Sequence, residues 1–105
     1  MKKILLVCSA GMSTSLLVSK MKISAREQGI DCVINAIAES EVDDYGKDFD
    51  VLLIGPQIRF LFNKLNSKFS DEGIPVSIIS TVDYGTMNGE KVLRHALDLI
   101  KNKKV

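Results

Sequence analysis

ILLVCSAGMSTSLLVSKM, residues 4–21, is the stretch that decides the fold. Four apolar residues at positions 4–7 are typical of a buried parallel strand, and they lead directly into Cys8. Small and flexible residues follow, and after them residues 17–25 repeat apolar side chains at helical spacing. The sequence therefore predicts a strand that ends at Cys8, then a loop, then a helix.

Similar apolar runs recur along the chain and alternate with helical patterns. Strands are expected over residues 2–8, 30–38, 49–55 and 74–80, and helices over residues 17–25, 58–69 and 92–100, with a polar crossover that has room for a short helix. This alternation predicts an α/β fold: a single open four-stranded parallel sheet of order 2-1-3-4, with helices on both faces. Ligands of such sheets bind beyond the carboxyl ends of the strands, where the strand order reverses. Cys8 is expected at the mouth of that crevice.

The composition is that of an ordinary globular domain. The 105 residues carry a net charge of +1, and we expect one domain spanning 1–105. The one dense basic cluster, residues 101–104, suits a solvated helix end, so no nucleic-acid partner is expected. The apolar run before Cys8 is too short for an export signal, and no stretch approaches the roughly 20 apolar residues of a membrane span. We expect a cytoplasmic protein with no direct membrane insertion, whose cysteines are thiols.

The loop after the first strand has the chemistry of an anion site. The first turn of a helix leaves backbone N–H groups unpaired, and its dipole favours a phosphate or a thiolate. Glycine lets the backbone turn closely, and serine and threonine hydroxyls can donate to phosphate oxygens. We expect Cys8 to be the catalytic nucleophile, although a small buried residue ending a strand is the competing interpretation. The expected phosphate-binding residues are Ser9, Ala10, Gly11, Met12, Ser13, Thr14 and Ser15.

The same loop is similar to the C-x5-R-[ST] signature of low-molecular-weight protein tyrosine phosphatases, with one departure. Thr14 occupies the place of the arginine, and Ser15 follows. A phosphatase needs that guanidinium to clamp the phosphate and to meet the charge of the transition state. Without it, the loop suits a relay in which Cys8 carries a phosphoryl group between a donor and an acceptor. A phosphatase-like or reductase-like cysteine enzyme and a non-catalytic anion-binding module remain the alternatives.

Three segments together resemble one protein family. VCSAGMSTSLLVSKM, residues 7–21, strongly resembles the phosphocysteine loop of the lactose/cellobiose-type enzyme IIB components of the bacterial sugar phosphotransferase system. LLIGPQIRF, residues 52–60, and VDYGTMNGEKVL, residues 82–93, resemble later segments of the same family. The resemblance implies a phosphotransferase that accepts a phosphoryl group from a phosphohistidine of enzyme IIA onto Cys8. It would pass the group to a cellobiose-like, β-glucoside-like or lactose-like sugar held by the membrane component IIC, without a cofactor or metal.

Other residues have more than one interpretation. Gln57, Asp83 and Tyr84 follow the third and fourth strands and are possible accessory residues, with ordinary turn residues as the alternative. Cys32 begins the second strand, about 15 Å or more from Cys8, so a disulfide is excluded and a core position is expected. His95 is expected to be structural or to face solvent.

An apolar rim for docking IIA is expected from Met12, Leu16 and Phe60, and core packing is the competing explanation. The acidic run over residues 39–50 lacks the spacing of a calcium loop, so we interpret it as a solvated crossover.

Overall fold

Four parallel strands form the central sheet: β1 (Lys2–Cys8), β2 (Cys32–Ala38), β3 (Val51–Ile54) and β4 (Val76–Ile78). They lie in the order β2-β1-β3-β4, which confirms the predicted order. This computed structural model describes residues 1–9 and 12–102, and in the first helix it describes the side chains from residue 14 onward. The helical elements are α1 (Met12–Glu27), η1 (Glu39–Glu41), α2 (Val42–Tyr45), η2 (Pro56–Leu61), α3 (Phe62–Ser70), α4 (Thr81–Gly85) and α5 (Gly89–Lys101).

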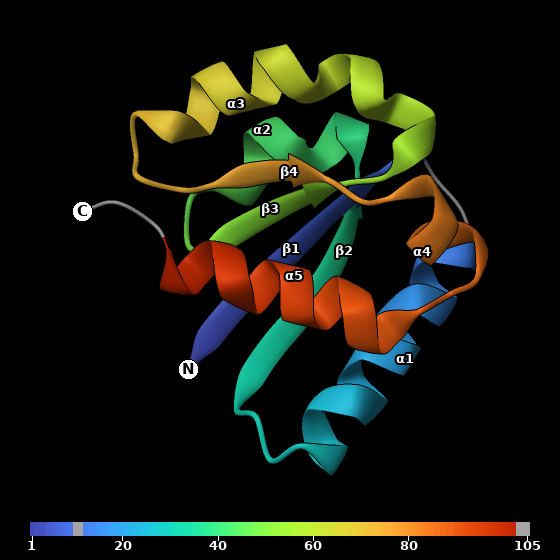
Figure 1. Cartoon of the computed structure of the whole chain (residues 1–105). Coiled ribbons are helices and arrows are strands. Elements are labelled where there is room, and N and C mark those ends of the chain that lie inside the picture. The colour runs from blue at the N-terminus through green and yellow to red at the C-terminus, as the bar shows by residue number, and fades with distance from the viewer. Residues whose placement is uncertain (10–11, 103–105) are drawn as a thin grey trace.

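Helices cover both faces of the sheet, as predicted. Along β1 the buried side chains alternate: Ile4 and Leu6 join the core beneath α1 and α5, and Leu5 and Val7 join the core on the side of α2 and α3. Figure 1 shows these two helical layers on opposite sides of the strands. Because β1 is central and covered on both faces, its carboxyl end, where Cys8 lies, is held firmly in place.

The first helix ends at Glu27, two residues after the apolar pattern that predicts it. Gly29 has a φ of 68°, which suits a glycine, and the Ile30 amide donates to the Ala25 carbonyl at 2.8 Å. Ile30 is still bonded to the helix end, so the apolar run over residues 30–38 enters the sheet at Cys32, the residue expected to begin the second strand.

The expected helix over residues 58–69 is divided in the structure. Pro56 starts the 3-10 segment η2, and Ile58 has non-helical angles of φ −121° and ψ 30° before α3 begins at Phe62. The apolar stripe is nevertheless buried at Ile58, Leu61, Leu65 and Phe69. Apolar spacing therefore identified the buried face but did not reveal the change in helix type.

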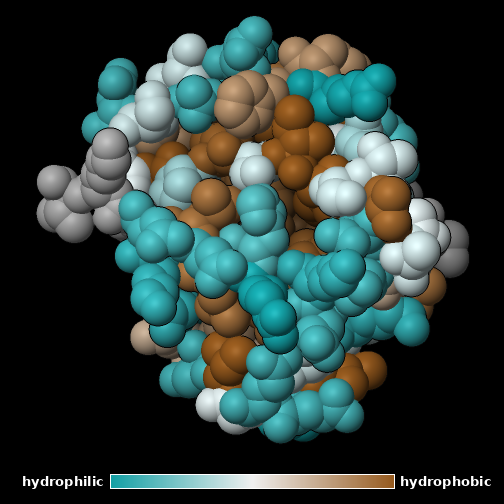
Figure 2. Space-filling view, viewed as in Figure 1, coloured by the Kyte–Doolittle hydropathy of each residue, from teal (hydrophilic) through white to brown (hydrophobic). Residues whose placement is uncertain are grey.

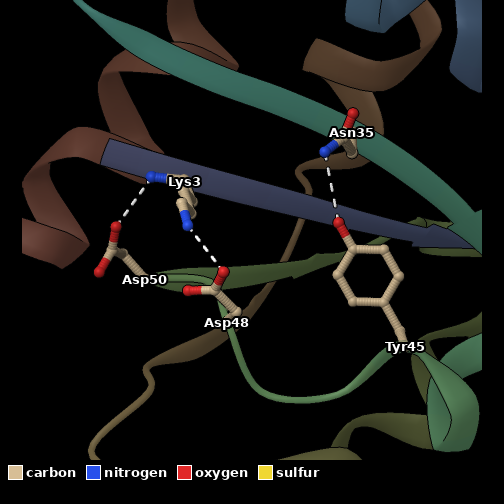
Figure 3. A network of polar contacts seen from close by, with 5 residues as sticks. All are labelled: Lys3, Asn35, Tyr45, Asp48 and Asp50. Atoms are coloured by element: carbon tan, nitrogen blue, oxygen red, sulfur yellow. Dashed lines mark hydrogen bonds and ion pairs between the residues drawn. The ribbon is translucent and has the colours of Figure 1, made fainter. Parts of the chain in front are cut away.

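The acidic crossover is mostly exposed and contains short helices, as predicted, but it also makes specific contacts with the sheet. The Lys3 amide donates to Asp50 Oδ2 at 2.8 Å, and Lys3 Nζ pairs with Asp48 at 2.7 Å (Figure 3). The Asn35 side-chain amide donates to the Tyr45 hydroxyl at 3.3 Å. The hydrogen bond and charge of Asp48 raise the pKa of Lys3 above its usual value. These contacts attach the crossover to β1 and β2.

A short helix that the sequence analysis did not predict, α4, lies between β4 and α5. Ser80 caps it, since its side-chain oxygen accepts from the Asp83 amide at 3.3 Å. Asn88 caps α5 by accepting from the Lys91 amide at 3.1 Å. Gly89, the first residue of α5, packs directly on α1: a Cβ added there would lie 2.6 Å from the Lys20 carbonyl carbon. The Gly89 contact places the start of α5 directly against α1.

Candidate active site

Cys8 is the last residue of β1, at the carboxyl edge of the sheet, as the sequence predicts. It is half-buried, and its thiol donates to the Ile37 carbonyl of β2 at a distance of 3.5 Å. The chain leaves β1 into α1 on one face of the sheet and leaves the neighbouring β3 into η2 and α3 on the other face, so the strand order reverses between β1 and β3. The thiol therefore lies at the topological switch point, where open parallel sheets bind ligands.

The structure describes part of the predicted phosphate loop. Ser9 and Ser15 are exposed, whereas Thr14 is 3% exposed. Ala10 and Gly11 lie outside the described residues, and so do the side chains of Met12 and Ser13, whose backbone begins α1. The first turn of α1 follows Cys8 after three residues, and its backbone N–H groups have no partner within the helix. The role of these residues in binding phosphate stays a prediction.

Two of the predicted residues meet in the structure. The Thr14 and Tyr84 hydroxyl oxygens lie 3.2 Å apart, so α4 contacts the first turn of α1. Tyr84 is 9% exposed and joins the core beneath α1 and α5. No local sequence pattern could have revealed this contact, because seventy positions separate the two residues.

An open cleft of about 730 Å³ lies between η2 and α4, and its lining includes Gln57, Arg59, Phe60 and Tyr84. The exposed Gln57 also approaches Gly55: its Oε1 would lie 3.3 Å from a Cβ added there, and that Cβ would lie 4.0 Å from the Cys8 Cα. Gln57, which lines the cleft, therefore lies near the backbone of Cys8. Arg59 was not among the predicted site residues; it follows β3 by five residues, which is the signal that could have found it.

Asp83 does not line the cleft between η2 and α4. It lines a separate cavity of about 210 Å³ that also contains Ser77 and His95, whose Oγ and Nε2 atoms lie 2.9 Å apart. His95 is exposed, which confirms one of its two expected settings. Figure 2 shows apolar residues at the surface along the edge strand β4, between α3 and the largely polar α5. The structure thus separates Asp83 from the cleft that Gln57 and Tyr84 share.

Cys32 lies at the opposite end of the sheet from Cys8. In the β1–β2 register Cys32 is opposite Lys2 and Cys8 is opposite Ala38, so about 20 Å of strand separates them. Both cysteines are free, as predicted. Cys32 packs against the core but remains half-buried, and burial, followed by the nearby charge of Asp31, raises the pKa of its thiol.

Three large apolar side chains on elements that follow the carboxyl ends of the strands, the end where Cys8 lies, are exposed. Leu16 of α1 is 51% exposed, Phe60 of η2 is 75% exposed and Val82 of α4 is 70% exposed. Core packing, the competing explanation for Leu16 and Phe60, is therefore wrong. The Met12 side chain, the third predicted member of the rim, lies outside the described residues.

Among the described residues, no helix has the length and apolar character needed to span a membrane.

A family model described as "PTS system, Lactose/Cellobiose specific IIB subunit" matches residues 3–95. The chain belongs to this family of phosphotransferase-system components. It is therefore a IIB component of the lactose/cellobiose type, a phosphotransferase component that takes part in sugar uptake.

Relatives of this family are similar in sequence to this protein over almost the whole chain. The oligo-beta-mannoside-specific EIIB component of Bacillus subtilis is 42% identical over 98% of this chain and 100% of its own length. The galactose-specific EIIB component of Lactococcus lactis subsp. cremoris is 43% identical, over 94% of this chain and 96% of its own.

Solved structures have the same fold. The cellobiose-specific IIB component of Borrelia burgdorferi superposes with a TM-score of 0.81 at 48% identity, covering 98% of this chain and 94% of that one. The lactose-specific IIB domain of Streptococcus pneumoniae gives a TM-score of 0.83 at 18% identity, covering 92% and 95% of the two chains. At that identity the second likeness concerns the fold alone.

Proposed function

We propose that residues 1–105 act as a single phosphocysteine carrier, in which Cys8 accepts a phosphoryl group from a phosphohistidine of enzyme IIA. IIB components of this system work with IIA and IIC partners. The observation that carries the proposal is the position of Cys8, at the carboxyl end of the central strand and separated by three residues from the first turn of α1. The N–H groups and the dipole of a first helical turn favour the binding of a phosphoryl group.

The chemistry consists of two balanced transfers. In the first, the Cys8 thiolate attacks the phosphorus of the phosphohistidine, an S–P bond forms, and the P–N bond breaks with its electron pair returning to the imidazole. In the second, a sugar hydroxyl oxygen attacks the same phosphorus, an O–P bond forms, and the hydroxyl proton passes to solvent or a base. The S–P bond breaks, and its electron pair restores the thiolate. The loop residues from Ser9 to Ser15 hold the phosphoryl group between the two steps.

The acceptor is a sugar held by the membrane component IIC, of the cellobiose-like, β-glucoside-like or lactose-like class. Relatives named for cellobiose, galactose and oligo-beta-mannoside support a sugar of this kind. The protein works in the cytoplasm, where both of its free cysteines remain reduced.

Enzyme IIA docks on the apolar rim beside Cys8. Leu16 and Phe60 support this docking, because each exposes most of a large apolar side chain near the carboxyl edge of the sheet. Exposed apolar side chains at one edge of a sheet favour association with a partner. Gln57 and Tyr84 line the adjacent cleft and complete the site.

The proposal is tested by incubating the protein with phosphorylated IIA and mapping the added phosphate by peptide mass analysis. We expect one phosphate on Cys8 of the wild type and none on Cys8→Ser, because a serine hydroxyl has no accessible anionic form at neutral pH. Cys32→Ser is the matched control and should be labelled like the wild type. Full labelling of a folded Cys8→Ser variant would refute the proposal.

A further inference from the structure

Tyr84 contacts the first turn of α1 through a hydrogen bond between its hydroxyl and that of Thr14. Thr14 is 3% exposed and Tyr84 is 9% exposed, so water has little access to the pair. A hydrogen bond in such surroundings is stronger than one in water, and its geometry is held more firmly. The tyrosine is therefore well placed to orient the threonine hydroxyl.

The two hydroxyl groups carry two protons, and their contact uses only one of them. Either oxygen is able to donate, so the remaining proton belongs to Thr14 whenever Tyr84 donates. With Tyr84 as the donor, the Thr14 proton is available to a further acceptor.

The direction of the Thr14 side chain suits a donor to the loop. Side chains of a helix lean toward its N-terminus, which for α1 is the end that follows Cys8. Thr14 also stands six residues after Cys8, the position at which the phosphatase signature carries its arginine. A hydroxyl here would supply one donor, without the charge of a guanidinium.

On the basis of the proposed phosphocysteine function, we infer that Tyr84 is a positioning residue for the phosphoryl group. It donates its hydroxyl proton to Thr14 Oγ1 and thereby leaves the Thr14 proton free to donate to a phosphoryl oxygen on Cys8. Tyr84 acts through Thr14 and does not itself touch the phosphoryl group. Its ring anchors α4 in the core, and its hydroxyl sets the direction of one donor in the site.

The test compares two tyrosine variants that each lose one hydroxyl. Tyr84→Phe removes the contact with Thr14, and Tyr45→Phe, the matched control, removes an exposed hydroxyl that accepts from Asn35. The rate of phosphate incorporation from phosphorylated IIA is measured by rapid quench, with thermal unfolding recorded for each variant. We expect Tyr84→Phe to slow incorporation about fivefold, equivalent to about 1 kcal/mol, and Tyr45→Phe to match the wild type.

A double-variant cycle distinguishes positioning from a purely structural role. We expect Tyr84→Phe to have no further effect on the rate in a Thr14→Val background, and Thr14→Ser to retain most of the wild-type rate. A Tyr84→Phe variant that is less stable but labelled at the wild-type rate would overturn the inference. A full fivefold loss in the Thr14→Val background would also overturn it, because Tyr84 would then act without Thr14. An unlabelled wild type would instead refute the proposed function, and this inference with it.

Discussion

Gly89→Ala tests how closely the start of α5 packs on α1. A Cβ at Gly89 would lie 2.6 Å from the Lys20 carbonyl carbon, 2.7 Å from the Met21 amide nitrogen and 2.8 Å from the Lys20 Cβ. Two of these three atoms are backbone, so relief requires α5 to move relative to α1. Overpacking of this kind costs about 1–3 kcal/mol. For a domain of this size, a loss of about 2 kcal/mol lowers the unfolding temperature by about 8–16 °C.

The assay is thermal unfolding followed by circular dichroism, with Gly85→Ala as the matched control. Gly85 lies at the end of α4 with nothing within 4 Å of its added Cβ, so the control should unfold within a few degrees of the wild type. If Gly89→Ala unfolded at the same temperature as Gly85→Ala, the close contact between α5 and α1 would be refuted.

Three further outcomes follow from the structure. Cys8 should be alkylated faster than Cys32 in the native protein, because burial raises the pKa of the Cys32 thiol; peptide mapping after brief iodoacetamide treatment checks this, and equal rates would contradict it. The hydrogen bond and charge of Lys68 hold the pKa of Asp43 below its ordinary value of 3.8. The pair therefore stabilises the folded protein at pH values above 3.8, and this stabilisation is lost as the pH falls through the lower pKa that Asp43 has in the folded protein. An NMR titration should show the Asp43 midpoint rising in Lys68→Gln; an unchanged midpoint would exclude the pair as the cause. Aryl phosphates should be hydrolysed negligibly, because Thr14 replaces the phosphatase arginine; robust turnover lost in Cys8→Ser would instead favour a phosphatase.

The layout of the sheet was predictable because each strand is a short apolar run flanked by a helical pattern. β1 has the predicted bounds, and Cys8 ends it as expected. The kink at Ile58 was not predictable, since apolar spacing reports which side chains are buried and is nearly the same for a 3-10 turn and an α-helical one. The five-residue helix α4 is too short to show a period of its own.

The candidate site was predictable in its local part only. Cys8, the loop and α1 are consecutive in sequence, so their chemistry could be inferred from one stretch. The contact between Thr14 and Tyr84 depends on how α4 folds back against α1, and the exposure of Phe60 depends on how η2 turns after β3. These are products of tertiary packing, and no spacing along the chain encodes them.

The most direct test of the account is a rapid-quench time course with phosphate-labelled IIA, this protein, and vesicles that contain IIC and sugar. Label is followed on Cys8 and in the sugar phosphate from the same samples. We predict that label on Cys8 rises first and then falls as sugar phosphate accumulates, at rates fast enough to account for the overall transfer. Sugar phosphate that forms at an undiminished rate with folded Cys8→Ser would contradict the account.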